Sequence, residues 1–316
     1  MKRLLSLLVL LPLACSLPVL AQESETDGPA TYLYAQKDSV SLFLDLYDPV
    51  PGSQTEVDGV PKPSIIFIFG GGFVMGSRNE ASYIPWFRQL AAEGYRVISI
   101  DYRLGLRGVK KMGIGQVDVL ENAINLVIED LFSATKYLID NAEELGIDPS
   151  RIVISGSSAG AISALQAEYT LCNGGALSSL LPEGFNYAGV MAFAGAILSR
   201  QGAVKFGKEP CPILLAHGTA DKMVPYDKIG FAKLRFAGSK QIAASLEKAG
   251  SNYNVLRFPG RGHEIAGMMI PLFKEEIRFL ESNVCGGTKR IVDATIYDPS
   301  YLTPAWASAT LDDLYR

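Results

Sequence analysis

The stretch Arg151-Ile152-Val153-Ile154-Ser155-Gly156-Ser157-Ser158-Ala159-Gly160 is a short β-branched run that ends in the pattern G-x-S-x-G. This order predicts a buried strand, a sharp turn that carries Ser158, and a helix that follows at once. We expect Gly156 and Gly160 where backbone segments pass too closely for a Cβ atom. Because amides at a helix N-terminus favour negative charge, the pattern nominates Ser158 as a nucleophile. The same pattern also arises by chance, so other residues must supply its partners.

Composition limits the classes of function. The chain has 316 residues, of which 48% are hydrophobic, and a net charge of −4, which is typical of a globular protein. The mildly acidic balance, without a basic stripe, argues against nucleic acid as a partner. Only two histidines are present, His217 and His263. A histidine-rich metal site is therefore excluded, and a histidine base must be one of these two.

The N-terminus has the pattern of an export signal. Lys2-Arg3 precedes an apolar run at residues 4–13, and small residues precede a polar stretch that starts at Gln22. This predicts a signal peptide at residues 1–21, cleaved after Ala21, and a secreted or periplasmic protein. A lipoprotein anchored through Cys15 is the alternative, but the preceding proline fits that pattern poorly. Prolines also interrupt the apolar run, so stable membrane insertion is not expected.

Three cysteines remain after the predicted cleavage. They are Cys172, Cys211 and Cys285. An oxidising compartment permits one disulfide among them and leaves one thiol over. The sequence leaves the pairing open, and none of the spacings matches a zinc motif.

Strand-like and helix-like segments alternate along the chain. This predicts an α/β fold with a mostly parallel central sheet and helices on both faces. We expect one domain at residues 22–285, and a C-terminal tail without a strong period at residues 286–316. Within the domain, residues 41–47 alternate like an antiparallel edge strand, and the apolar run 64–69 suits a central strand. Residues 265–281 predict a closing helix.

A glycine run, Gly70-Gly71-Gly72, follows the predicted central strand. Glycines leave backbone amides unshielded, so such a loop can direct two N–H groups at an oxyanion. The amide of Ala159, after the predicted nucleophile, would add a further donor. The alternative is a glycine turn that binds no ligand.

Two further loops supply an acid and a base. Asp221 follows a predicted strand, where a carboxylate can orient a histidine and stabilise its charged form. His263 lies in the glycine-rich loop Gly260-Arg261-Gly262, for which a solvent-exposed turn is the alternative. We interpret His217 as a strand-end histidine that bonds its own loop. The order Ser158, Asp221, His263 is that of the α/β-hydrolase triad.

With these motifs, the chain resembles α/β-hydrolases of the carboxylesterase type, close to the hormone-sensitive-lipase-like and polysaccharide-esterase branches. The resemblance covers residues 41–281 and implies an oxyanion hole made by Gly71, Gly72 and Ala159. Phe69 departs from the family, which usually has a histidine there that braces the loop. The stretch Asp101-Tyr102-Arg103-Leu104 also resembles the family, and we expect a structural role in which Arg103 pairs with a carboxylate.

The sequence therefore predicts a secreted serine carboxylester hydrolase that works through an acyl-enzyme. This chemistry requires no metal and no organic cofactor. The expected substrate is a small-molecule or carbohydrate ester, such as acetyl or feruloyl groups on polysaccharide. A serine peptidase or amidase on the same fold is one alternative, although propeller-like repeats that would gate peptides are not visible. A catalytically silent binding protein is the other, and the presence of every triad member argues against it.

Overall fold

The computed structural model describes residues 28–37, 39–110, 113–301, 304 and 310–315. The predicted signal peptide, its cleavage site after Ala21 and Cys15 lie outside the described residues. Among the helices of the described residues, none has both the length and the apolar character that a bilayer crossing requires.

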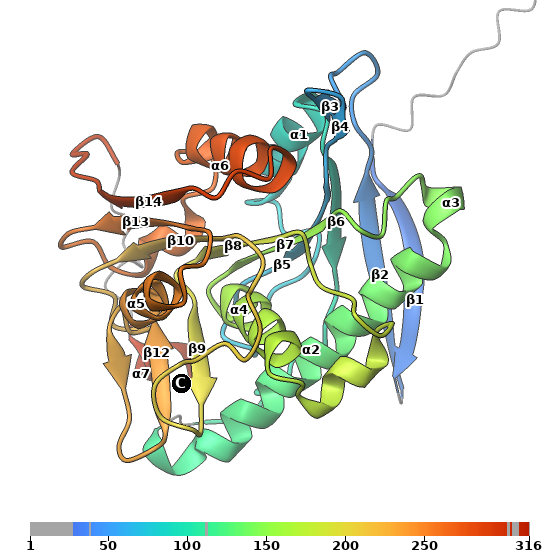
Figure 1. Cartoon of the computed structure of the whole chain (residues 1–316). Coiled ribbons are helices and arrows are strands. Elements are labelled where there is room, and N and C mark those ends of the chain that lie inside the picture. Colours follow the sequence, from blue (N-terminus) through green and yellow to red (C-terminus); the bar gives the residue numbers. More distant parts are fainter. Residues whose placement is uncertain (1–27, 38, 111–112, 302–303, 305–309, 316) are drawn as a thin grey trace, which may run out of the picture.

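A nine-stranded sheet forms the centre of the molecule (Figure 1). From β6 to β14 all neighbouring strands are parallel, whereas β2 is antiparallel to both of its neighbours. The sheet confirms the expected α/β-hydrolase architecture. In spatial order the strands are β1 (Ala30–Lys37), β2 (Val40–Tyr47), β6 (Arg96–Ile100), β5 (Ser64–Ile68), β7 (Ile152–Ser157), β8 (Gly189–Phe193), β10 (Ile213–Gly218), β13 (Tyr253–Phe258) and β14 (Ile291–Thr295).

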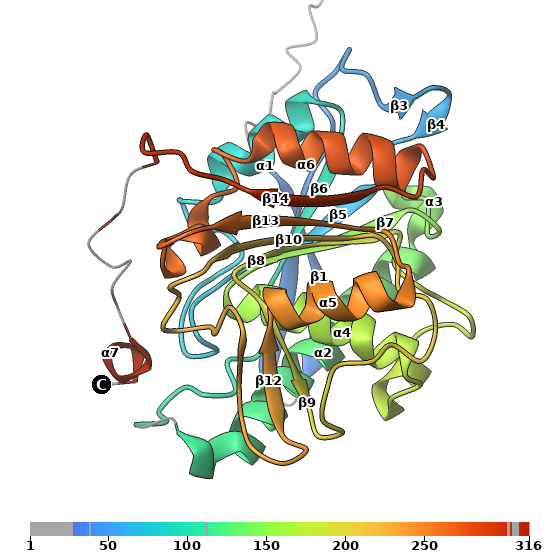
Figure 2. The same cartoon turned by 60° about the vertical axis from the view of Figure 1, so that its left-hand side comes forward.

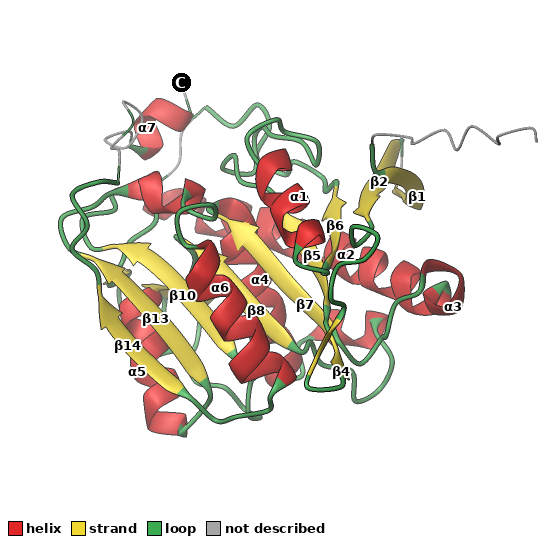
Figure 3. Ribbon diagram, turned by 90° about the horizontal axis from the view of Figure 1, so that it is seen from above, coloured by secondary structure: helices red, strands yellow, loops and turns green. Residues whose placement is uncertain are grey.

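Helices cover both faces of this sheet, as predicted. Figure 2 shows α1 and α6 on one face and α2, α4 and α5 on the other. A short helix, α7, lies apart from both layers, beyond the carboxyl ends of the parallel strands (Figure 3). The α-helices are α1 (Ile84–Ala92), α2 (Val117–Asp140), α3 (Ala142–Leu145), α4 (Ala159–Cys172), α5 (Ser239–Ala249), α6 (Phe273–Phe279) and α7 (Leu311–Leu314).

Smaller elements complete the described chain. Two sheets lie outside the central one, a three-stranded sheet of β9 with β11 and β12, and a two-stranded sheet of β3 and β4. These strands are β3 (Glu56–Val57), β4 (Val60–Pro61), β9 (Ala196–Ser199), β11 (Lys228–Ile229) and β12 (Arg235–Gly238). The 3₁₀-helices are η1 (Ile114–Gln116), η2 (Ala176–Leu180) and η3 (His263–Gly267), and η4 (Leu280–Cys285) is a π-helix.

The apolar pattern of the central strands is explained by burial on both faces. Every residue of β5, β7, β8 and β10 is buried. The expectation of an edge strand at residues 41–47 is wrong, because β1 pairs with the outer side of β2. The sequence of β1 does not predict a strand, because Tyr34 is its only buried residue and its apolar residues do not alternate regularly with polar ones.

The end of the chain also differs from expectation. The closing helix predicted at residues 265–281 is interrupted, because Pro271 separates η3 from α6 and proline cannot continue a helix. Within the predicted tail, β14 pairs in parallel with β13 and is the last strand of the central sheet. Only two of its five residues are half-buried and the others are exposed, so its sequence lacks an apolar period.

The three cysteines of the described chain are all free and buried, so the disulfide that the compartment would permit is not formed among them. Two of them meet a buried carboxyl group on α4. The Cys172 thiol and the Cys211 amide both donate to Oε1 of Glu168, at 3.3 and 2.8 Å. Burial raises the pKa of both thiols, so they pack as small apolar groups.

Candidate active site

Three side chains predicted from the sequence lie in a hydrogen-bonded series. The Oγ atom of Ser158 is 2.7 Å from Nε2 of His263. On the other side of the ring, Nδ1 of His263 is 2.8 Å from Oδ2 of Asp221. The structure thus brings together a hydroxyl, an imidazole and a carboxylate that are up to 105 residues apart in sequence.

The parallel sheet explains why they meet. Ser158 follows β7, Asp221 follows β10, and His263 follows β13. These strands run in one direction, so their carboxyl ends reach the same edge of the sheet (Figure 3). Loops at this edge are where ligands bind in open α/β sheets.

Ser158 occupies a strained turn between β7 and α4. Its φ of 51° and ψ of −115° lie outside the regions that side-chain-bearing residues prefer. A Cβ on Gly156 would lie 2.3 Å from the Gly160 backbone, and one on Gly160 would lie 2.0 Å from the carbonyl of Ile68. The two glycines therefore permit the close approach that the turn requires, as the sequence predicts.

Asp221 is held by four donors. Its Oδ1 accepts the amides of Met223 and Val224, at 2.9 and 3.0 Å. Its Oδ2 faces Nδ1 of His263 and also lies 3.3 Å from Nε2 of the buried His217. Burial by itself would raise the pKa of Asp221, but the hydrogen bonds from both histidines outweigh it and hold the pKa well below its usual value. Asp221 is therefore a carboxylate at neutral pH.

The hydrogen-bond partners assign the tautomers of both rings. Nδ1 of His263 faces a carboxylate and so carries the proton, which leaves Nε2 free to accept the hydroxyl proton of Ser158. Nε2 of His217 faces the carbonyl of Val224 at 3.1 Å as well as Asp221, so Nε2 carries its proton and Nδ1 accepts from Ser239. The geometry thus sets the hydrogen-bond-accepting nitrogen of the His263 ring beside the Ser158 hydroxyl.

The glycine loop supplies unpaired donors. The amides of Gly71, Gly72 and Ala159 find no hydrogen-bond acceptor among the described residues. Gly71 and Gly72 have φ values of 119° and 61°, which glycine adopts without strain. Ala159 is buried and the two glycines are half-buried, and amides at such positions are usually paired, so these N–H groups beside Ser158 are available to a negatively charged oxygen.

Aromatic residues brace this loop where the family usually has a histidine. The ring of Phe69 stacks on Tyr102, with 4.1 Å between the ring centroids. The hydroxyl of Tyr102 donates to the carbonyl of Phe69 at 3.0 Å, and the hydroxyl of Tyr83 accepts the amide of Gly70. Stacking and two hydroxyls thus support the strand end and the first glycine of the loop.

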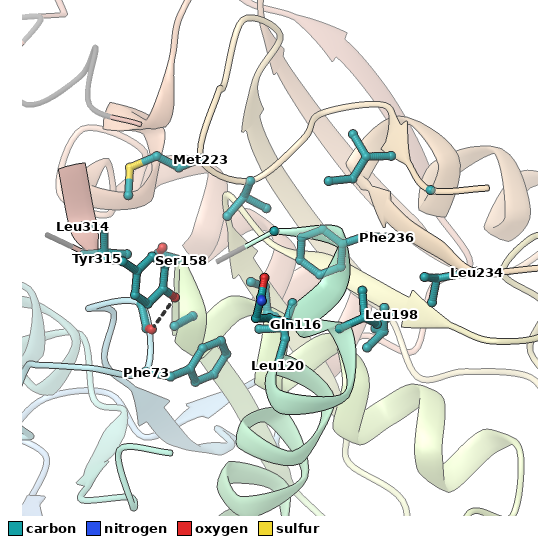
Figure 4. A pocket seen from close by; sticks show the side chains of 18 of the residues that line it. Phe73, Gln116, Leu120, Ser158, Leu198, Met223, Leu234, Phe236, Leu314 and Tyr315 are labelled. Atoms are coloured by element: carbon teal, nitrogen blue, oxygen red, sulfur yellow. Dashed lines mark hydrogen bonds between the residues drawn. The ribbon is translucent and has the colours of Figure 1, made fainter. Parts of the chain in front are cut away.

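Two pockets adjoin Ser158. The apolar pocket, of about 340 Å³, also contacts Ala159 and Gly72 and is lined mainly by hydrocarbon side chains (Figure 4). Its walls include Leu120, Ile162, Leu198, Val224, Phe236 and Tyr315. The second pocket, of about 600 Å³, contains His263 together with Ser158 and has a mixed polar and apolar lining that includes Ser82 and Tyr83. We call it the histidine-side pocket. The serine therefore stands between two spaces of different character.

Comparison with known proteins places this chain in a family. The phospholipase/carboxylesterase family model matches residues 116–280, more than half of the chain. The chain belongs to the phospholipase/carboxylesterase family. A second family model, described as BD-FAE, matches residues 44–174 and so covers the glycine loop and the serine turn.

Two relatives of this phospholipase/carboxylesterase chain are named as a hydrolase and a lipase. It is 35% identical over 127 residues to phenmedipham hydrolase of Pseudarthrobacter oxydans, covering 40% of this chain and 22% of that protein. It is 29% identical over 173 residues to secreted lipase 1 of Botryotinia fuckeliana, covering 54% of this chain and 27% of that protein. The chain therefore spans about a quarter of the length of these relatives.

A solved structure of similar fold is the thermophilic esterase Est2 of Thermogutta terrifontis in its native form. The TM-score is 0.59 at 23% identity, over 84% of this chain and 96% of the other. At this identity, the similarity between the two proteins shows only that they share a fold.

Several contacts at the site could not be read from the sequence. His217 does bond its own loop, as interpreted, but it also contacts Asp221, for which the four-residue spacing was the only signal. Leu314 and Tyr315 line the apolar pocket although they lie in the predicted tail.

The expectation for Arg103 is confirmed, since its guanidinium pairs with Glu129 and Asp130. Within the described chain, no cluster of acidic, histidine and cysteine side chains has the arrangement of a metal site.

Proposed function

We propose that this protein is a carboxylic ester hydrolase in which Ser158 is the nucleophile, His263 the general base and acid, and Asp221 the residue that orients His263. The observation that carries the proposal is the series of 2.7 and 2.8 Å contacts from Ser158 through His263 to Asp221. These distances are within the range in which proton transfer between positioned groups occurs. The unpaired amides of the glycine loop give the same site its electrostatic component.

The reaction proceeds in two halves. As Oγ of Ser158 bonds to the ester carbonyl carbon, its proton passes to Nε2 of His263, and the carbonyl oxygen becomes an oxyanion held by the amides of Gly71, Gly72 and Ala159. Collapse breaks the bond to the alcohol, which leaves with the proton from His263. Water then attacks the acyl-enzyme and gives its proton to the same ring. Collapse of this second intermediate breaks the bond to Oγ, releases the acid, and returns the proton from His263 to Ser158.

Proton transfer assigns the two pockets. The leaving alcohol must lie within reach of Nε2 of His263, and His263 lines only the larger of the two pockets beside Ser158. The alcohol therefore occupies the histidine-side pocket, whose mixed lining suits a polar group such as a sugar. The acyl group occupies the apolar pocket, which is more than twice the volume of a cavity of about 150 Å³ that holds a benzene ring.

This volume favours feruloyl over acetyl among the polysaccharide esters expected from the sequence. An acetyl group would leave most of the apolar pocket unfilled, whereas an aromatic or medium-chain acyl group would bury its surface there. A polysaccharide substrate agrees with the export signal predicted at residues 1–21, and one relative is named a secreted lipase. N-terminal sequencing of the exported protein tests that signal, and we expect Gln22 as the first residue.

The test of the proposed function is covalent labelling combined with hydrolysis. We expect a fluorophosphonate to label the purified protein once, at Ser158, as read by mass spectrometry of its peptides. Ser158→Ala should abolish labelling and lower kcat for p-nitrophenyl butyrate by several orders of magnitude, whereas Ser179→Ala, an exposed control, should retain both. A wild-type protein that neither labels nor hydrolyses esters would refute the proposal and favour a binding protein.

A peptidase or amidase would use the same three side chains. The apolar pocket does not distinguish the two, because it contacts only the acyl side of the scissile bond. Comparison of p-nitrophenyl butyrate with a dipeptidyl anilide decides between them. A higher kcat/KM for the anilide would replace the esterase assignment.

A further inference from the structure

The C-terminal helix α7 lies at the active site, although it follows β14, the outermost strand of the central sheet. Leu314 of α7 lines both pockets beside Ser158, and Tyr315 lines the apolar pocket. Figure 4 shows both side chains at the end of the apolar pocket where Ser158 lies. Their positions make α7 part of the boundary between the space for the acyl group and the space for the alcohol.

A hydrogen bond joins this segment to the glycine loop. The hydroxyl of the buried Tyr315 donates to the carbonyl of Gly72 at 3.0 Å. Burial raises the pKa of Tyr315 to about 12, so the hydroxyl keeps its proton at any pH at which an ester assay is run. The bond therefore persists throughout the working range and fixes the orientation of the peptide that follows Gly72.

Packing joins the two segments as well. A Cβ on Gly72 would lie 2.2 Å from Cδ2 of Leu314, so the side chain occupies the space that the glycine leaves empty. Helix α7 is capped locally, because the amide and hydroxyl of Thr310 both donate to Oδ2 of Asp313, at 3.0 and 2.8 Å. The cap, the hydrogen bond and the packing all favour the placement of the Leu314 side chain against Gly72.

We infer that Leu314 and Tyr315 are specificity-determining and positioning residues of the proposed ester hydrolysis: Leu314 walls the acyl pocket and favours bulky apolar acyl groups, and Tyr315 holds the glycine loop. The inference rests on the proposed function for its substrate class. An acyl chain enters the apolar pocket past Leu314, at the Ser158 end. A long chain buries several methylenes against this side chain, whereas an acetyl group presents a single methyl group and loses less when the side chain is shortened.

The first test measures acyl selectivity. We expect Leu314→Ala to lower the ratio of kcat/KM for p-nitrophenyl octanoate to that for the acetate by about four- to fifteenfold, the effect of about one or two methylenes in an apolar pocket. Leu314→Met should restore the ratio, because it conserves volume. Leu33→Ala, an exposed control on β1, should leave it unchanged. An unaltered ratio in Leu314→Ala would overturn the role of Leu314.

The second test concerns Tyr315. Tyr315→Phe keeps the ring and removes only the hydroxyl, so we expect kcat for the acetate to fall about threefold or more, as expected for loss of about one hydrogen bond, with little change in KM. Tyr297→Phe is the matched control, since that ring is 79% exposed. Equal changes in kcat and KM, or none, would contradict a role in positioning the loop.

Product binding separates this inference from the proposed function. Octanoate binding, measured by calorimetry on the full chain, needs no turnover. Weaker octanoate binding by Leu314→Ala than by wild type supports the role of Leu314 in lining the acyl pocket, even if the wild type hydrolyses no ester. Equal affinities, or no binding to the wild type, overturn it even if Ser158-dependent hydrolysis is found.

Discussion

Replacement of Asp221 by asparagine tests the hydrogen-bond network most directly. Oδ1 of Asp221 accepts two backbone amides, so in Asp221→Asn this position must be taken by the amide oxygen. The NH₂ group then faces Nδ1 of His263, where the carboxylate stood at 2.8 Å. A donor at that place forces Nδ1 to accept, and the proton of the neutral ring moves to Nε2. The ring can then no longer accept the proton of Ser158.

The expected loss of kcat in Asp221→Asn follows from the protonation of Nε2 in His263. A triad with the wrong tautomer loses about 10⁴-fold in kcat, which corresponds to about 5.5 kcal/mol of activation free energy. Asp221→Ala removes the carboxylate without imposing a donor, and we expect it to reduce kcat less than Asp221→Asn does. The backbone amides of Met223 and Val224 keep their acceptor in the asparagine variant, so its fold should be retained.

The assay is steady-state hydrolysis of p-nitrophenyl butyrate at neutral pH, with circular dichroism and thermal unfolding as controls for the fold. A reduction of kcat below tenfold in a folded Asp221→Asn protein would refute the reasoning. It would mean that a group other than Asp221 orients His263.

Three further predictions concern stability. Tyr102→Phe leaves the carbonyl of Phe69 without its donor and should cost about 1–3 kcal/mol in urea unfolding, so an unchanged midpoint would contradict the bracing role. Arg103→Ala leaves the fully buried carboxylate of Asp130 without its cation, with only the backbone amide of residue 103 as a donor, and should cost about 3–5 kcal/mol, whereas adding Asp130→Asn should recover part of the loss. Burial raises the pKa of Glu276 well above its usual value, so its contribution to stability is full below about pH 4 and is lost as pH rises. Glu276→Gln should therefore leave Tm nearly unchanged at pH 4 and raise it by about 2 °C or more at pH 8, measured by calorimetry, and an equal difference at both pH values would contradict this.

The sequence predicts best those features that are fixed by local sterics or by complete burial. The strands buried on both faces have continuous apolar runs, and the turn at Ser158 needs glycines at both sides, so both could be found without coordinates. Edge strands have no such signal. Both β1 and β14 are largely exposed, and their membership of the sheet depends on pairing with neighbours rather than on their own patterns.

The features that the sequence does not predict depend on contacts between distant segments. The order of Ser158, Asp221 and His263 along the chain nominated three residues, but only the fold gives the distances between their atoms. The bond from Tyr315 to Gly72 joins residues 243 positions apart, and no local pattern near residue 315 indicates it. Residues whose roles depend on such long-range contacts cannot be identified from local sequence patterns, whatever their chemistry.

The backbone of Ser158 carries an evolutionary implication. A side-chain-bearing residue at a φ of 51° and ψ of −115° costs about 1–3 kcal/mol, and glycine would relieve that cost. The folded chain would thus be more stable without its hydroxyl, which is a trade between durability and reactivity. In relatives that are no longer selected for catalysis, replacement of this serine by glycine would therefore increase the stability of the fold.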